Sequence, residues 1–249
     1  MILRDISFEN PHENILFDDF LLYLAETGQS NEVLRFWESP KIFIVLGKIA
    51  NPQEDLKIDN ILREEIPVLR RSSGGGTVVQ GKGCLNFSLI LSKQENPEIA
   101  FLKKSYEFIL RKIIQTLKIL NVNAVFRPIS DLALAHNEKK FSGNAQKRGK
   151  NFILHHGTIL YDFSFDVVEK YLTVPVEIPE YRRGRSHSDF LTNIRIVPEN
   201  LKMATASVFG ANDKKLDLTT EEQKMFSQFL EEKKALVYVN LVEKKEEYV

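Results

Sequence analysis

The sequence predicts a single α+β domain, in which short strands are interleaved with a few helices. Strand and helix signals alternate along the 249 residues without a repeat, a low-complexity block or an interdomain linker. Hydrophobic residues make up 43% of the chain and charged residues 27%, which is typical of a globular protein and leaves enough apolar surface for a sizeable core.

The first elements are one helix and two strands. A helix is expected over residues 14–27, where apolar residues share one face and Gly28 supplies a stop signal. Two apolar runs, 33–37 and 42–46, are separated by Ser39-Pro40. They predict a pair of strands joined by a turn.

The next elements surround a cluster of glycines. Helical spacing predicts a helix over residues 53–65, and Pro67 then opens a short strand over residues 68–71. A strongly apolar strand over residues 85–91 follows the cluster. The glycines are therefore expected to join strands.

The second half begins with the clearest helix, over residues 101–120, where apolar residues recur every three or four positions between basic ones. Short β-like segments at 124–127, 131–135 and 152–162 then predict a second antiparallel set, broken by a polar turn at 147–150. The tail is expected to hold a helix at 165–172, a loop rich in proline and arginine at 175–185, an acid-capped helix at 220–233 and an edge strand at 237–242.

Charge and cysteine content restrict the class of protein. Lys plus Arg and Asp plus Glu both number 34, so no global field attracts nucleic acid. Cys84 stands alone, which excludes an intrachain disulfide, and the first residues lack the pattern of a signal peptide. The apolar runs are too short to span a bilayer. We therefore expect a cytoplasmic protein with neither a nucleic-acid nor a membrane partner.

The sharpest motif is RRSSGGGTV, residues 70–78. Three consecutive glycines let the backbone approach a ligand and present N–H groups to an anion, and Arg70 and Arg71 add fork-shaped donors. The spacing matches neither the Walker loop nor the dinucleotide fingerprint. The motif predicts a site for an anionic ligand, with a plain mobile turn as the alternative.

A second cluster comprises Asp131, the segment KKFSGNAQ from Lys139 and the segment HHGT from His155. A lysine held at a strand end stabilises charge during acyl transfer, and Asp131 is suited to orient an attacking amine or accept its proton. Solvated surface charges are the alternative interpretation. The two adjacent histidines lack a spacing that brings both rings to one metal, so no metal ligand is assigned.

Together these segments resemble the catalytic domain shared by lipoate-protein ligases, octanoyltransferases and biotin-protein ligases. The resemblance covers roughly the first two-thirds of the chain and rests on WESPKIFIVLGKIANPQEDL, RRSSGGGTVVQGKGCLNFS and KKFSGNAQKRGKNFILHHGTIL. It implies a mixed, largely antiparallel β-sheet flanked by helices. It also implies one catalytic domain over residues 1–249, with residues from about 215 as a short C-terminal extension and no separate accessory domain.

The resemblance implies roles for individual residues. Lys140 takes the catalytic position, with Asp131 in the same pocket. Binding of the acyl carboxyl group and of the adenylate is implied for a larger set: Arg70, Arg71, Ser73, Gly74, Gly75, Gly76, Thr77, Asn86, Ser142, Gly143, Asn144, His156, Gly157 and Thr158.

The implied reaction is ligation of lipoate, or of octanoate, to a carrier lysine. Lipoate and ATP give lipoyl-adenylate with Mg²⁺, and the carrier lysine then attacks the acyl carbonyl. ATP and Mg²⁺ are cosubstrates, and no tightly bound cofactor is expected. The implied carriers are the lipoyl domains of E2 subunits or the glycine cleavage H protein, and a separate accessory subunit remains an alternative.

The sequence departs from the family pattern at two places. Gln80 stands where ligases commonly carry a histidine. Octanoyltransferases work through a cysteine thioester, yet no cysteine follows Arg127, and Cys84 is expected to be a buried, inert thiol. ATP-independent octanoyl or lipoyl transfer between carriers, and a non-catalytic acyl-adenylate binding homologue, stay open. The arginine-rich segment 181–187 is either a dock for an acidic carrier or a solvated loop.

Overall fold

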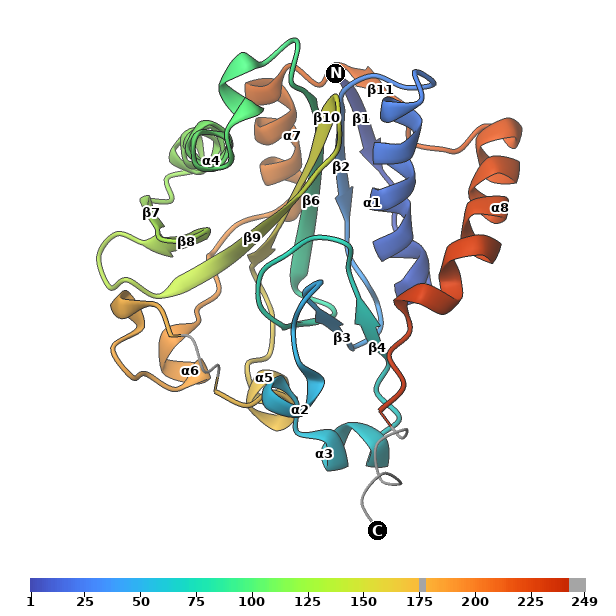
Figure 1. The fold of residues 1–249 in the computed structure, drawn as a ribbon. Helices are drawn as coiled ribbons and strands as arrows, with labels where there is room; N and C mark the ends of the chain where they lie inside the picture. The colour runs from blue at the N-terminus through green and yellow to red at the C-terminus, as the bar shows by residue number, and fades with distance from the viewer. Residues whose placement is uncertain (175–177, 242–249) are drawn as a thin grey trace.

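A computed structural model of the chain describes residues 1–174 and 178–241. Its strands form an eight-stranded sheet in the order β11-β1-β2-β6-β10-β9-β8-β7 and a three-stranded sheet in the order β4-β3-β5 (Figure 1). The strands are β1 (Ile2–Asp5), β2 (Val33–Trp37), β3 (Phe43–Leu46), β4 (Val68–Arg70), β5 (Val78–Gln80), β6 (Cys84–Ser92), β7 (Ala124–Arg127), β8 (Asp131–Leu134), β9 (Lys140–Arg148), β10 (Phe152–Leu160) and β11 (Asp213–Lys214). The α-helices are α1 (Pro11–Glu26), α2 (Pro52–Asp55), α3 (Ile58–Arg63), α4 (Leu102–Ile119), α5 (Asp166–Tyr171), α6 (His187–Phe190), α7 (Pro198–Phe209) and α8 (Thr220–Val237).

The large sheet is mixed and largely antiparallel. β1 runs parallel to β2 and to β11, and the pairings from β2 to β7 are antiparallel. All nine residues of its central strand β6 are buried, because the sheet is covered on both faces. The predicted sheet type is therefore confirmed.

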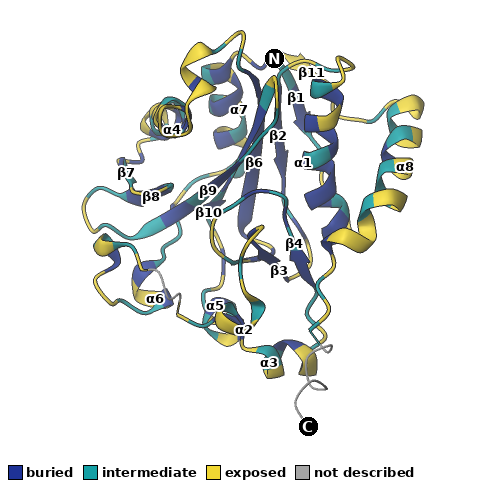
Figure 2. Ribbon diagram, in the orientation of Figure 1, coloured by how far each residue is buried: buried dark blue, intermediate teal, exposed yellow. Residues whose placement is uncertain are grey.

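Helices cover the two faces of the large sheet separately. α4 and α7 pack with the odd-numbered residues Phe87, Leu89 and Leu91 of β6, whereas α1 packs with Ile90, which points the other way. α8 lies against the outside of α1 (Figure 1). Figure 2 shows the consequence, with buried strands between helices that are exposed on their outer faces.

Local sequence explains the ends of the covering helices. Pro11 is in the first turn of α1, where its fixed φ fits a helix. The backbone N–H that proline lacks would have no hydrogen-bond partner within the helix at this position. Thr219 and Glu222 form a capping box at the start of α8, as the acid-rich sequence predicts. Helix α4 matches the expected helix at 101–120 within one residue at each end.

The small sheet carries the glycine cluster. β3 pairs in parallel with β4 and antiparallel with β5, and residues 71–77 connect β4 to β5. The prediction that the glycines join strands is confirmed. A third apolar cluster, which includes Ile44, Ile61 and Val168, holds this sheet against α3 and α5.

Some predicted pairings were wrong. The strands at 33–37 and 42–46 do not pair, because β2 is occupied on both edges by β1 and β6 while β3 belongs to the small sheet. The segments at 124–127, 131–135 and 152–162 do not form a separate set, since β10 pairs with β6 and extends one sheet.

Other elements differ from the expected ones. Strand β9 covers the predicted polar turn in part, and the predicted helix at 53–65 divides into α2 and α3. β1, β5, β9, β11, α6 and α7 were not predicted. Of the expected edge strand at 237–242, Tyr238 makes a single bridge to Leu69, and residue 242 lies outside the described residues. Residues 175–177 of the expected loop also lie outside them. In the described part of the chain, no helix is both long and apolar enough to cross a membrane.

Candidate functional site

The candidate site lies on the face of the large sheet that α1 covers. The register places Thr158 of β10 opposite Gly143 of β9, and His156 opposite Ala145. Directly opposed residues point to the same face, so these four positions share one surface. We call this surface the site face.

A β-bulge places Lys140 on the site face. Ala133 pairs with Lys140 while its neighbour Leu132 pairs with Ser142, so Phe141 is an extra residue on β9. Strict alternation from Gly143 would turn Lys140 toward the opposite face, where Leu132 is buried in the core. The extra residue reverses this direction, as bulges do beside functional sites.

Lys140 forms an ion pair at this position. Its ammonium lies 2.7 Å from Asp131 Oδ1, and the Tyr181 hydroxyl donates a hydrogen bond of 2.6 Å to Asp131 Oδ2. Both carboxylate oxygens of Asp131 therefore have a partner. The residue is only 7% exposed, so little water reaches it. Burial, followed by the negative charge of Asp131, raises the pKa of Tyr181.

Gly143 provides the space for the lysine. A Cβ atom at this position would lie 3.3 Å from both Cε and Nζ of Lys140 and 3.9 Å from Asp131 Oδ1. The end of the Lys140 side chain therefore lies directly over Gly143, and a larger residue at position 143 would crowd the ion pair.

The glycine loop, residues 72–77, lies on the same face. A Cβ on Gly75 would be 3.6 Å from the Cβ of Ala145, and Gly75 has a φ of +84° that disfavours other residues. Gly143 and Ala145 are two residues apart on one strand, a spacing of about 7 Å. The loop and the Lys140 ammonium thus flank one stretch of the site face.

Both arginines of the motif hold backbone in this structure. Arg71 donates to Ser73 Oγ at 3.0 Å and to the carbonyls of Gly74 and Gly76 at 2.7 and 2.8 Å. Arg70 donates to the carbonyls of Gly47 and Ala50, each at 2.9 Å.

These contacts set the shape and the polarity of the loop. Burial lowers the pKa of Arg71 to about 10, so its guanidinium remains charged near neutral pH. Arg71 binds the carbonyls of Gly74 and Gly76, and Gly75 and Gly76 are exposed. Within the described residues, the N–H groups of Gly74, Gly75 and Gly76 donate no hydrogen bond. This arrangement suits an anion.

A polar trio lies next to Gly143 on the site face. Thr158 donates to Asn86 Oδ1 at 2.7 Å, and Gln80 Nε2 donates to Asn86 at 3.0 Å and to Thr158 Oγ1 at 2.9 Å. Gln80, the residue that departs from the family pattern, thus binds two of the expected site residues. Thr77, at the end of the loop, donates its hydroxyl to Asp55 of α2.

Three expected site residues point to the opposite face. Asn144 donates to the carbonyl of Ser130 at 2.8 Å and to Ser142 Oγ at 3.2 Å. A Cβ on Gly157 would lie 2.1 Å from Asn144 Oδ1 and 2.7 Å from the ring of Phe87. Ser142, Asn144 and Gly157 therefore pack beneath the site rather than beside the glycine loop.

The adjacent histidines also lie on opposite faces. His155 is buried, accepts from Gln146 at Nδ1 and donates to Asn144 Oδ1 through Nε2. Burial, and then the nearby His156, lowers the pKa of His155 to about 3, so the ring is neutral. His156 Nε2 lies 2.7 Å from Ser73 Oγ of the glycine loop. Among the described residues, no group of three or more His, Cys, Asp or Glu side chains is placed to hold a metal.

Cys84 lies at the start of β6 and is fully buried. Burial raises the pKa of its thiol far above the ordinary value, which removes the thiolate that a nucleophile requires. The prediction of a buried, inert thiol is confirmed in its geometry.

The arginine-rich segment is largely folded onto itself. Arg182 and Arg185 lie over the ring of Phe190 and bind each other's carbonyl oxygens. Arg183 is the exposed one, with its guanidinium 3.0 Å from Glu138. The segment therefore presents one arginine outward and places the Tyr181 hydroxyl against Asp131.

Sequence reasoning missed Gly47, Asp18 and Asp19. A Cβ on Gly47 would lie 1.8 Å from the carbonyl oxygen of Gly75, so only glycine lets the two loops approach. Its signal was a glycine directly after a buried strand. Asp18 follows Phe17 on the apolar side of a helix, and a charge in that place requires a buried partner.

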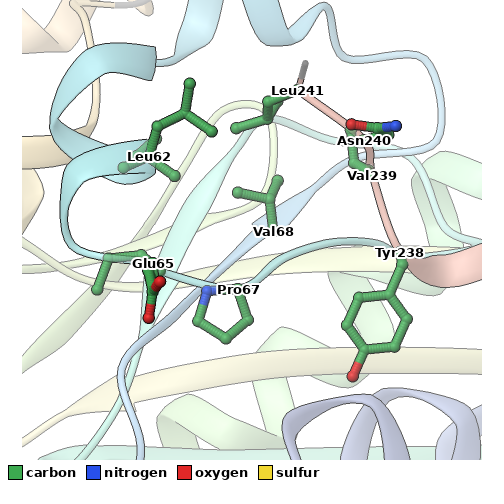
Figure 3. A pocket seen from close by; sticks show the side chains of 10 residues that line it. Leu62, Glu65, Pro67, Val68, Tyr238, Val239, Asn240 and Leu241 are labelled. Carbon is green, nitrogen blue, oxygen red and sulfur yellow. The ribbon is translucent and has the colours of Figure 1, made fainter. Parts of the chain in front are cut away.

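A separate pocket lies beside β4, where residues 238–239 bond to Val68 and Leu69, away from the site residues. It has a volume of about 320 Å³ and is lined by Leu62, Glu65, Pro67, Val68 and residues 238–241, among others (Figure 3). None of the expected site residues lines it.

Comparison with known proteins identifies relatives. Residues 10–208 match the family model of the lipoyl protein ligase A/B catalytic domain. A protein of Mycoplasma genitalium described as "Probable lipoate-protein ligase A" is 33% identical over 165 residues, which are 66% of this chain and 47% of that protein. The chain spans less than half the length of the first curated relatives that it matches.

Solved structures share the fold. A bi-partite lipoate protein ligase of Thermoplasma acidophilum, described together with its E2 lipoyl domain, has a TM-score of 0.74 at 21% identity, with 93% of this chain and 92% of that chain covered. A lipoate-protein ligase A bound with ATP has a TM-score of 0.72 at 22% identity, with coverages of 93% and 94%. These likenesses confirm the expected fold type.

Proposed function

Because the chain belongs to the lipoyl protein ligase A/B catalytic domain family, we propose that it is a lipoate-protein ligase. It activates lipoate, or octanoate, with ATP to an acyl-adenylate and transfers the acyl group to a lysine of a lipoyl carrier domain. The relatives named as lipoate-protein ligases and the ATP-bound neighbour support this proposal.

The observation that carries the proposal is the arrangement of charge on the site face. The Lys140 ammonium, held by Asp131, and three free amides of the glycine loop flank one stretch of sheet. A fixed cation and fixed N–H groups stabilise the negative charge that develops on phosphate and on a carbonyl oxygen.

The first half-reaction forms the adenylate. The lipoate carboxylate attacks the α-phosphorus of ATP, a P–O bond to pyrophosphate breaks, and pyrophosphate leaves. Lys140 and the loop amides neutralise the oxygens of the phosphate that is attacked. Mg²⁺ is expected to enter with the ATP phosphates, because it keeps several waters and needs few protein ligands.

The second half-reaction transfers the acyl group. The neutral amine of the carrier lysine attacks the acyl carbonyl, the bond to AMP breaks, and the amine proton is lost to solvent or to a carboxylate. The same cation stabilises the oxyanion and the departing AMP. Asp131 acts in both halves by holding Lys140 at a fixed position.

We also propose the partners and extent of the enzyme. The acceptor is a lipoyl domain of the E2 type, as in the Thermoplasma system, or the glycine cleavage H protein. The segment from about residue 215 acts as part of the single catalytic domain, because Phe226 of α8 packs against Phe17 and Phe20 of α1. A separate accessory subunit, and a cytoplasmic location, stay predictions.

ATP-independent transfer through a cysteine is less well supported. Cys84 has no exposed surface, and the elevated pKa of its thiol leaves almost no thiolate at neutral pH. The geometry therefore favours activation by ATP over a thioester.

The proposal is tested by lipoate transfer to a purified apo lipoyl domain, followed by intact mass. One lipoyl mass gained only in the presence of ATP and Mg²⁺ supports the ligase. Transfer from an octanoyl carrier without ATP would replace it with the transferase. Transfer from lipoyl-adenylate, but not from lipoate and ATP, would indicate that an accessory subunit supplies the first step.

A further inference from the structure

Two consecutive aspartates of α1 reach the two serines of the glycine loop. The Ser72 hydroxyl donates to Asp19 Oδ1 at 2.5 Å. Ser73 Oγ lies 2.7 Å from His156 Nε2, and His156 Nδ1 lies 3.5 Å from Asp18 Oδ2. The loop is thus tied to one helix directly at Ser72 and through an imidazole at Ser73.

Each aspartate has its own cation. Burial raises the pKa of Asp18, but the guanidinium of Arg35, 2.7 Å away, acts together with His156 and Ser88 to bring the pKa below its ordinary value. Asp19 receives the ammonium of Lys147 of β9 at 2.9 Å. Both carboxylates are therefore anchored on the helix and the large sheet, independently of the loop that they hold.

The geometry at Ser73 suits holding rather than nucleophilic attack. The side chain is buried, and its oxygen accepts a hydrogen bond from Arg71 Nε at 3.0 Å. The 3.5 Å between His156 and Asp18 is longer than a strong hydrogen bond. Ser73 is thus fixed by two groups and has no open side toward a substrate.

We propose that Asp18 and Asp19 are positioning residues that clamp the glycine loop onto the site face before substrate binds. Asp19 acts through Ser72, and Asp18 acts through His156 and Ser73. The inference rests on the proposed function, because the clamped loop is the one that would receive the acyl carboxylate and the phosphate. It adds how the loop is kept ready for that anion.

The clamp has a defined kinetic consequence. A loop that samples other arrangements binds substrate only in its competent fraction, so the apparent affinity falls by that fraction. Once substrate is bound the loop is in place, and the chemical step proceeds as before. Loss of the clamp therefore raises KM for lipoate more than it lowers kcat.

The first experiment needs no substrate. Amide hydrogen exchange is followed at the Lys48 N–H, which donates to the Ser73 carbonyl of the loop at 2.8 Å, in Asp19→Asn and Ser72→Ala, with Ser72→Thr as the variant that keeps the hydroxyl. Asp59→Asn, an exposed aspartate of α3, is the matched control. We expect about tenfold faster exchange in the first two variants, the effect of losing one charge-assisted hydrogen bond, and wild-type exchange in the other two. Unchanged exchange in Asp19→Asn would overturn the proposal.

The second experiment measures KM and kcat for lipoate in the same set. We expect KM to rise about tenfold in Asp19→Asn with kcat within about twofold of wild type. A fall in kcat at constant KM would contradict a positioning role. Ser73→Ala tests the Asp18 branch without breaking the buried pair with Arg35, and the same KM increase is expected. If the wild-type chain transfers no lipoate but exchange responds as expected, the clamp stands and only the proposed function fails.

Discussion

The Lys140 ammonium lies 2.7 Å from Asp131 Oδ1, because β9 has one residue more than its partner strand β8 at the bulge. The bulge at Phe141 turns Lys140 out of the apolar core and onto the face where the glycine loop lies. The position of the cation thus follows from a backbone irregularity, and the functional proposal depends on it.

We expect substitutions of Asp131 and of Tyr181 to slow the transfer reaction to different extents. Asp131→Asn removes the charge that holds Lys140, and we expect transfer from lipoyl-adenylate to fall by about a hundredfold, as for loss of a stabilising group at a reacting centre. Tyr181→Phe removes one hydrogen bond but keeps the ion pair, so the expected loss is below about tenfold. Single-turnover rates measure both. Equal losses in the two variants would contradict the dominance of the ion pair.

Substitution of Gly157 is expected to lower the stability of the fold. Alanine at this position would place its Cβ 2.1 Å from Asn144 Oδ1, and we expect a loss of about 1–3 kcal/mol in the free energy of unfolding, as for overpacked cores. Gly76→Ala is the matched control, because its Cβ would meet no atom within 4 Å. Urea denaturation measures both variants. An unfolding free energy of Gly157→Ala equal to that of the control would contradict tight packing between Gly157 and Asn144.

Regular patterns in the sequence predicted much of the fold. The spacing of apolar residues in α4 gave its ends within one residue, and the glycines were expected between two strands, as observed. In contrast, β9 was missed because KFSGNAQKR has polar residues on both faces, which a buried strand rarely carries. Those polar residues face the site on one side and the His155 network on the other.

The candidate site was predicted in part for a related reason. Lys140 and the glycine loop stand out as motifs, but their shared face depends on the bulge at Phe141, which alternation does not reveal. Asp18 stands out only by its place on the apolar side of a helix, and Asp19 resembles an ordinary helix acid until folding brings the loop beside it. The remaining contacts are tertiary, so local pattern carries no signal for them.

His155 predicts a pH dependence of stability. Its pKa is about 3 in the folded state, against about 6.5 when unfolded, so the unfolded chain binds the extra proton first. Stability from this residue is present above pH 6.5 and is lost as the pH falls toward 3, by up to about 1.4 kcal/mol per pH unit.

The variant His155→Gln removes this part of the pH dependence. Denaturation curves between pH 7 and 4 should therefore show a shallower loss of stability in His155→Gln than in wild type. His136→Gln, at an exposed position, is the control and should keep the wild-type slope. Parallel curves for all three proteins would contradict a buried neutral imidazole.

Substitution of Cys84 is expected to leave the rate of lipoate transfer nearly unchanged. Cys84→Ala should transfer lipoate at a rate within about twofold of wild type, because a buried thiol with an elevated pKa supplies no nucleophile. The transfer assay with lipoate and ATP measures this rate. Loss of transfer in a variant that remains folded by circular dichroism would bring a thioester mechanism back.

The most direct test of the account compares two neighbouring lysines. Lipoyl transfer to an apo lipoyl domain with ATP and Mg²⁺ is measured by intact mass for Lys140→Ala and, as the matched control, Lys139→Ala. We expect Lys140→Ala to lose at least about a hundredfold in rate and Lys139→Ala to stay within about threefold of wild type, since only Lys140 pairs with Asp131 on the site face. Full activity in Lys140→Ala, or equal losses in both variants, would contradict the assignment of Lys140 as the central cation.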